Sequence, residues 1–209
     1  MHLGNAVNFV VIDNYAEQHG LELILRIDDI DVVRARPEYR SDIDRVLQWL
    51  EISPSLRTSN ASSSVYRDAL HQLPVFHCRC SRTSTQCACA HRDFPLVPGE
   101  SVAKLHDSSI VLWRRDDLPA YHLVNVVDDA RLGITDVVRG EDLRESSFIH
   151  SQIARLLGFT PPKYLHHPLI TDAAGAKLSK STLRSGTAMS SDAATLEWVR
   201  ERAREMPLT

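Results

Sequence analysis

Apolar positions along the chain predict helices that alternate with short buried strands. Between Leu3 and His19 apolar residues recur at three- and four-residue spacing and stop at Gly20, which predicts a helix. The dense aliphatic run from Leu21 to Ile27 predicts a buried strand of the parallel type that ends in an acidic loop. Similar spacing predicts further helices over Asp42–Leu50, Val65–Leu73, Phe148–Leu157 and Ala193–Arg204.

Polar stretches separate these elements. Ser53–Ser64 is rich in serine, asparagine and proline, which predicts a loop, and Cys78–Asp107 lacks an apolar period, which predicts an insertion without its own core. Leu169–Ile170 is predicted to be a short strand that leads into a lysine-bearing loop. Regular structure is also expected at Ile110–Trp113, Tyr121–Val127 and Gly133–Val138. Alternating strands and helices favour an α/β fold with a mainly parallel sheet, in which ligands bind at the carboxyl ends of the strands.

The composition is that of a globular protein. Hydrophobic residues make up 43% and charged residues 24% of the 209 positions, which argues against disorder. No apolar run approaches the roughly 20 residues that a membrane span needs, and no signal-peptide pattern opens the chain, so a soluble, cytoplasmic protein is expected. Proteins that coat nucleic acid non-specifically are usually basic, so with a net charge of -3 any RNA contact must rest on a local patch.

Two short motifs are suited to bind phosphate. His2-Leu3-Gly4-Asn5 opens the first helix, where a glycine lets phosphates approach the backbone N–H groups closely. Taken alone, this pattern is more often an ordinary helix start. Lys177-Leu178-Ser179-Lys180-Ser181 places two lysines three residues apart, so that both can reach a triphosphate. Taken alone, it is more often a solvated basic loop.

A third motif is suited to bind a carboxylate. The segment Val138–Leu143 contains Arg139, and it follows Tyr121 and the pair Asp128-Asp129. An arginine can hold a carboxylate through two parallel hydrogen bonds, and a tyrosine can orient it. The alternative is that Arg139 pairs structurally with one of the nearby acidic residues.

These segments, in this order, resemble class I glutamyl-tRNA synthetases, and most closely their subfamily of glutamyl-queuosine tRNA(Asp) synthetases. The resemblance covers nearly the whole chain. His2–Asn5 resembles the HIGH signature and Lys177–Ser181 the KMSKS signature. Four further segments follow the family's patterns. Leu25–Asp31 resembles LRIEDxD, Tyr121–Asp129 resembles YxLAxVVDD, and Gly133–Leu143 resembles GITHVVRGEDL. His167–Leu169 resembles the family's histidine segment before the lysine loop.

The resemblance implies a Rossmann-type fold, ATP accompanied by Mg²⁺, and attack of the glutamate carboxylate on the α-phosphate without a covalent enzyme intermediate. It assigns four residues to ATP, namely His2, Gly4, Asn5 and Lys180. It makes His2, Asn5, Lys177 and Lys180 the catalytic residues. It assigns glutamate to Asp28, which stands where the family has a glutamate, and to Tyr121 and Arg139.

All four cysteines lie in one short segment, as Cys78, Cys80, Cys87 and Cys89. In the resembled subfamily one CxC pair joins a distal tyrosine and cysteine around zinc, whereas here a second CxC pair follows early. Four thiolates form a tetrahedral structural zinc site in many proteins, and His77 or His91 could substitute for one of them. Free buried cysteines, or a decayed site that binds nothing, are the alternatives.

The chain departs from the family at both ends. Family members carry a strand of the form RFAPSPTGxLH before the HIGH signature, whereas only Met1 precedes His2 here, so the first central strand is expected to be missing. No anticodon-binding domain is expected after the lysine loop. The predicted organisation is a catalytic domain in two halves, 1–76 and 108–181, an inserted cysteine-rich segment, 77–107, and a short helical tail, 182–209.

The resemblance thus predicts a ligase that activates glutamate with ATP and transfers it to queuosine in the anticodon loop of tRNA(Asp). Two alternatives remain. The first is an N-terminally truncated, catalytically silent relative, or a fragment of a glutamyl-tRNA synthetase. The second is an amino-acid ligase of a small-molecule pathway.

Overall fold

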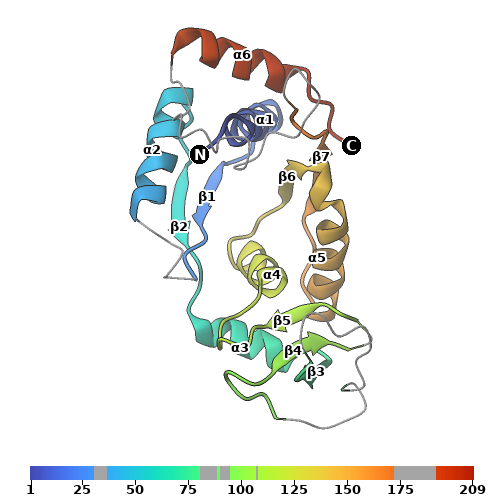
Figure 1. Ribbon diagram of the computed structural model, residues 1–209. Helices are drawn as coiled ribbons and strands as arrows, with labels where there is room; N and C mark the ends of the chain where they lie inside the picture. Colours follow the sequence, from blue (N-terminus) through green and yellow to red (C-terminus); the bar gives the residue numbers. More distant parts are fainter. Residues whose placement is uncertain (31–36, 81–88, 90–94, 107, 172–191) are drawn as a thin grey trace. The chain divides into compact units, whose positions relative to one another are not determined.

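A computed structural model of the chain describes residues 1–30, 37–80, 89, 95–106, 108–171 and 192–209. The chain divides into two compact units (Figure 1). Unit 1 comprises residues 1–59, 136–144 and 164–209, and unit 2 comprises residues 60–135 and 145–163. Each unit therefore draws on separate stretches of the sequence.

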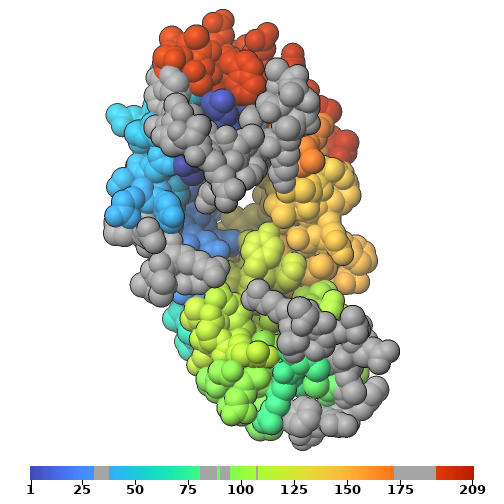
Figure 2. Space-filling model, viewed as in Figure 1, coloured from blue at the N-terminus to red at the C-terminus, as the bar shows by residue number. Residues whose placement is uncertain are grey.

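Unit 1 is built around α1 (Leu3–His19), which packs against α2 (Pro37–Leu50), β6 (Asp136–Gly140) and α6 (Ala193–Arg204) (Figure 1). Small apolar side chains on several sides of α1 are buried, so this helix belongs to the core. It ends where Gly20 takes a φ of 63°, a left-handed conformation that a glycine adopts without a Cβ clash. In the space-filling view α6 (red) presents a broad surface (Figure 2).

The strands of unit 1 form two pairs. β1 (Ile24–Ile27) runs parallel to β2 (Leu56–Ser59), with Ile24 opposite Leu56. β6 pairs with β7 (Lys163–His167), and the N–H of Lys163 donates to the carbonyl of Thr135 at 2.8 Å, so both strands begin side by side and run in parallel. Within the described residues no strand joins the two pairs into one sheet.

Unit 2 combines an antiparallel sheet with helices. The sheet consists of β3 (Val75–Cys78), β4 (Val102–Leu105) and β5 (Val111–Trp113), with β4 in the middle. Val75 lies opposite Leu105, and the register shifts between Ala103 and Lys104. Trp113 is fully buried, donates from its indole N–H to Asp117 at 3.0 Å, and lies under the guanidinium of Arg67. The helices of unit 2 are α3 (Ser63–His71), α4 (Tyr121–Arg131) and α5 (Arg144–Leu156). The first residue of α5, Arg144, and the 3₁₀ turn η2 (Glu141–Leu143) before it belong to unit 1.

The helices predicted from the sequence are all present, and α1 and α6 have the predicted bounds. Three predictions about strands are wrong. Ser53–Ser64 is not only loop, because it contains β2, and the segment 78–107 contains β4. Leu169–Ile170 is not a strand, since β7 ends at His167. None of the described helices is long and apolar enough to cross a membrane.

Candidate active site

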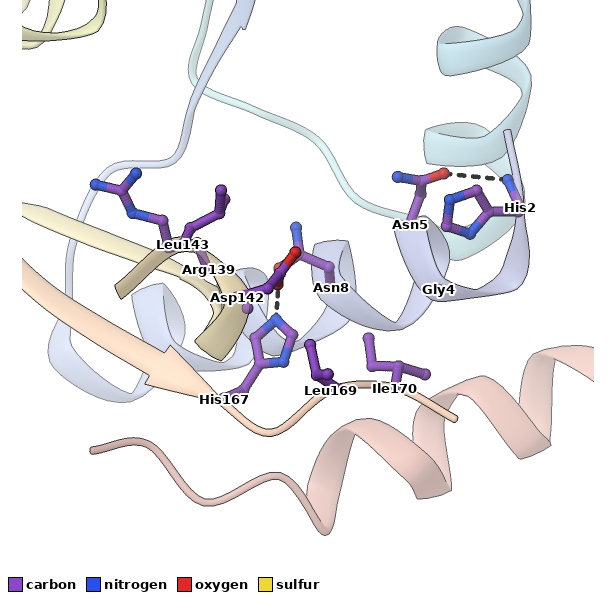
Figure 3. A pocket seen from close by; sticks show the side chains of 11 residues that line it. His2, Gly4, Asn5, Asn8, Arg139, Asp142, Leu143, His167, Leu169 and Ile170 are labelled. Carbon is purple, nitrogen blue, oxygen red and sulfur yellow. Dashed lines mark hydrogen bonds between the residues drawn. The ribbon is translucent and has the colours of Figure 1, made fainter. Parts of the chain in front are cut away.

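A cavity of about 190 Å³ lies in unit 1 at the start of α1 (Figure 3). We call it the Arg139 pocket. In the view of Figure 3, His2 and Asn5 lie at one end of its lining and Arg139 at the other. Its volume is below the range of about 300–1,000 Å³ that holds whole small-molecule ligands, so it suits an amino acid or a phosphate group. It is lined by His2, Gly4, Asn5, Asn8, Arg139, Gly140, Asp142, Leu143, His167, Leu169 and Ile170.

The first turn of α1 forms one wall of the pocket. His2 is the N-cap residue, and its backbone N–H donates to Oδ1 of Asn5 at 3.2 Å. The first N–H groups of a helix have no acceptor within the helix, and the partial positive charge of the helix dipole adds to their attraction for an anion. No acidic residue occupies the first turn of α1, and Gly4 has no side chain to keep a ligand away from the backbone. This wall can therefore receive a phosphate or carboxylate oxygen.

Arg139 forms the opposite wall. It is the fourth residue of β6, only 9% exposed, and its guanidinium stacks on the ring of Tyr164 at 4.5 Å. Stacking restricts the guanidinium to one plane, and the edge of a guanidinium in such a plane is the part that binds a carboxylate bidentately. A Cβ on Gly140 would lie 2.6 Å from Oδ1 of Asp142, so the neighbouring glycine lets this carboxylate come close to the strand.

Two histidines at the end of β7 complete the surroundings. His167 contacts the carbonyl of Pro168 through Nδ1 and the amide of Asn8 through Nε2, both at 2.8 Å (Figure 3). Burial lowers the pKa of His166 below its ordinary value, and the charges of Arg144 and Arg139 lower it further. His166 is therefore neutral near pH 7 and adds no charge beside Arg139.

The structure gathers His2, Gly4, Asn5 and Arg139, which the sequence predicts as ligand-binding residues, around this pocket. Asp28 lies elsewhere in unit 1, exposed and directly after β1, and does not line it. Tyr121 belongs to unit 2, where it is the first residue of α4. Lys177 and Lys180 lie outside the described residues.

Sequence reasoning did not single out Asn8 and Asp142 as site residues. Asn8 follows Asn5 by three positions, which puts both on the same face of α1, and Asp142 belongs to the same arginine segment as Arg139. Helix periodicity could have identified the first residue. Asp142 could be identified only from the structure, in which η2 brings its carboxylate close to Gly140.

The cysteines form a cluster in unit 2. Cys78, Cys80 and Cys89 place their Sγ atoms within 4.8 Å of one another, and Sγ of Cys80 lies 3.6 Å from Sγ of Cys89. These thiols are free of disulfides. Zinc bound to thiolates at about 2.3 Å in a tetrahedron holds its sulfurs about 3.8 Å apart, so the three positions fit such an ion. The predicted fourth ligand, Cys87, lies outside the described residues.

Comparisons with known proteins identify relatives of this chain. The family "tRNA synthetases class I (E and Q), catalytic domain" matches residues 1–75 and 97–201. A glutamyl-Q tRNA(Asp) synthetase from Rhodobacter capsulatus is 31% identical over 86% of this chain and 86% of its own length. One from Parasynechococcus marenigrum is 34% identical over 89% of this chain and 71% of its own length. A glutamate–tRNA ligase from Thermosynechococcus vestitus is 31% identical over 92% of this chain but 51% of its own length.

Solved structures show the same fold. A glutamate tRNA ligase from Elizabethkingia meningosepticum superposes with a TM-score of 0.68 at 19% identity, over 88% of this chain and 50% of that chain. The predicted α/β fold of the class I synthetases, with a small cysteine-bearing insertion, is thereby confirmed. Family match, sequence identity and fold coincide, and the chain belongs to the class I tRNA synthetases of the E and Q family, with whose catalytic domain it aligns.

Proposed function

We propose that this chain activates glutamate with ATP and transfers it to queuosine in tRNA(Asp). In the first step a glutamate carboxylate oxygen bonds to the α-phosphorus of ATP, and the bond from that phosphorus to the bridging oxygen of pyrophosphate breaks. In the second step a hydroxyl oxygen of the acceptor bonds to the glutamyl carbonyl carbon, AMP leaves, and the hydroxyl proton passes to solvent or a base. Mg²⁺ would arrive with the ATP phosphates and offset their charge.

The observation that carries the proposal is that one pocket combines the N-terminal turn of α1 with a stacked arginine. An adenylate-forming site needs to hold an anionic phosphate and a carboxylate close together, and these two walls offer donors to both. Similarity supports the queuosine acceptor, because glutamyl-Q tRNA(Asp) synthetases are 31% and 34% identical to this chain over 86% and 89% of its length.

The residue roles follow the resemblance. His2, Gly4 and Asn5 would contact ATP, and Arg139 would hold a glutamate carboxylate. Asp28 would bind the substrate amino group, and Tyr121 would orient the amino acid. Lys177 and Lys180 would offset the charge that builds on the leaving pyrophosphate, as two neighbouring ammonium groups can.

Exchange of labelled pyrophosphate into ATP tests the first step. Purified protein is expected to catalyse exchange with glutamate in the absence of any tRNA, because the subfamily that it resembles activates glutamate alone. Labelled glutamate should then be transferred to tRNA(Asp) that carries queuosine and not to the same tRNA isolated from a queuosine-deficient strain.

Each other outcome favours a different function. Exchange that appears only with tRNA would indicate a glutamyl-tRNA synthetase. Exchange without labelling of any tRNA would indicate a ligase for a small molecule. Binding of ATP with no exchange for any amino acid would indicate a catalytically silent relative.

The cysteine cluster fits a structural zinc ion held by Cys78, Cys80 and Cys89. Such an ion would tie the end of β3 to Cys89. The cluster lies in unit 2, whereas the Arg139 pocket lies in unit 1, so its role would be to stabilise the fold.

Metal analysis of protein purified without chelator should find one zinc ion per chain. The variants Cys78→Ser and Cys80→Ser are expected to lose it, because a neutral hydroxyl is a poor zinc ligand compared with a thiolate. Ser101→Ala, a buried substitution in the same unit, serves as the control and should keep its zinc. Full zinc content in both cysteine variants would contradict the assignment.

A further inference from the structure

Three aromatic side chains in unit 2 form a cluster in which each ring contacts the other two. The proposed reaction uses only one of them, Tyr121. Tyr121 and His122 are the first two residues of α4, and His150 lies in the middle of α5. The ring centroids lie 5.2 Å apart for Tyr121 and His122, 5.3 Å for Tyr121 and His150, and 5.2 Å for the two histidines. We call this cluster the histidine triangle.

The two histidines are joined by a hydrogen bond. Nδ1 of His122 lies 3.1 Å from Nε2 of His150, and His150 is 0% exposed. Such a bond needs an N–H on one ring and a lone pair on the other, so one imidazole donates and the other accepts. Burial makes this bond hard to lose, because a ring nitrogen cut off from water would then have no replacement for it. The bond therefore fixes the plane of both rings.

Tyr121 differs from its two neighbours because its side chain reaches solvent. It is 44% exposed, while its ring lies against both imidazoles at angles of 65° to His122 and 52° to His150. The backbone at this position is held by the helix and by the amide of Asn125, which donates to the carbonyl of Tyr121 at 2.9 Å. Only the two side-chain torsions of Tyr121 remain, and the histidine rings close two of the directions in which it could turn.

We propose that the His122–His150 pair is a positioning device that holds the Tyr121 ring in the orientation in which it meets the amino-acid substrate. The inference rests on the proposed function, since that function gives Tyr121 its contact with glutamate. Neither histidine is a catalytic residue: they act through Tyr121. Disorder of the ring would weaken substrate binding and leave the chemistry of the bound complex nearly unchanged.

The central variant is His122→Leu, because His122 is only partly buried and its replacement leaves the core position of His150 intact. In pyrophosphate exchange it is expected to raise the KM for glutamate about tenfold, with kcat and the KM for ATP changed less than about twofold. His122→Gln should return the KM for glutamate to within about threefold of the wild-type value, because an amide can both donate and accept at this place. His71→Leu, the same exchange at the exposed end of α3, is the matched control and should behave as wild type.

A second readout does not depend on activity. In protein labelled with ¹³C-tyrosine, the ring signal of Tyr121, assigned from a Tyr121→Phe variant, should move in His122→Leu and return toward its wild-type position in His122→Gln. An unmoved signal, an unchanged KM for glutamate, or equal effects on the KM for both substrates would overturn the positioning role. Wild-type protein without exchange for any amino acid would instead refute the proposed function, and the ring signal would still decide whether the histidines hold Tyr121.

Discussion

Substitution of Asp128 by alanine is expected to lower the free energy of unfolding of unit 2 by about 3–5 kcal/mol. Asp128 is 0% exposed and accepts hydrogen bonds from the amide of Asn60 and the hydroxyl of Tyr66, both at 2.8 Å. The backbone N–H of Ala61 and Nε of Arg131 add longer contacts of 3.3 and 3.4 Å. Alanine would remove the acceptor of the Asn60 amide and of the buried Tyr66 hydroxyl and leave a cavity beside them, which costs far more than the contacts gain in the native protein.

Tyr66 is a hydrogen-bond donor to Asp128 in this network. Burial, and then the hydrogen bond to Asp128 and its negative charge, raise the pKa of Tyr66 well above its usual range. The hydroxyl therefore keeps its proton and remains a donor to Asp128. Tyr66→Phe removes one donor without burying a new charge, so it should cost about 1–2 kcal/mol, less than Asp128→Ala.

Tryptophan fluorescence can follow this unfolding separately in unit 2. The chain has three tryptophans, and Trp113 is fully buried in unit 2, whereas Trp49 and Trp198 belong to unit 1. With Trp49 and Trp198 replaced by phenylalanine, a urea titration reports the surroundings of Trp113 alone. Asp68→Ala, an exposed acid on α3, should change stability by less than about 0.5 kcal/mol. Equal midpoints for the Asp68 and Asp128 variants would contradict the prediction.

Substitution of Arg139 by alanine should raise the KM for glutamate in pyrophosphate exchange by about 100- to 1,000-fold, which corresponds to roughly 3–4 kcal/mol of lost binding. The guanidinium is almost completely buried and stacked on Tyr164, so its charge and its plane are held in one place beside the pocket. Arg139→Lys should lie between alanine and wild type, because an ammonium group keeps the charge but neither stacks nor binds a carboxylate bidentately.

A surface arginine of the same unit provides the control. Arg200 pairs with Glu51 at 2.5 Å on the exposed side of α6, and Arg200→Ala should leave the KM for glutamate unchanged. A loss confined to kcat in the Arg139 variants, with the KM for glutamate as in wild type, would place this arginine elsewhere in the reaction.

Helix bounds were the part of the fold most accessible from the sequence. α1 ends at a glycine, and α6 begins at Asp192, whose carboxylate accepts from the N–H of Thr195 at 2.7 Å. β2 and β7 were missed because their residues do not alternate between apolar and polar. β2 is a partly exposed strand of sequence LRTS, stabilised by pairing with β1, and β7 buries two histidines that a hydrophobicity pattern counts as polar.

The candidate site could be predicted only in part. Its residues were identified by their family order, and the structure brings His2, Asn5 and Arg139 to one pocket although Arg139 follows Asn5 by more than a hundred positions. No local sequence pattern predicts that these residues lie close together, because their proximity depends on how β6 packs against α1. The histidine triangle was equally hidden, because its hydrogen bond joins residues of two helices.

The division of unit 1 into three stretches of sequence affects its synthesis on the ribosome. The valines of α1 pack in one core with Val199 and Ala203 of α6, whereas the chain passes into the other unit and back twice before α6 is made. At about 5–20 residues per second, α1 leaves the ribosome roughly 10–35 s before α6 exists. During that interval its apolar sides lack their final cover, so chaperone occupancy during translation should be highest over this first helix.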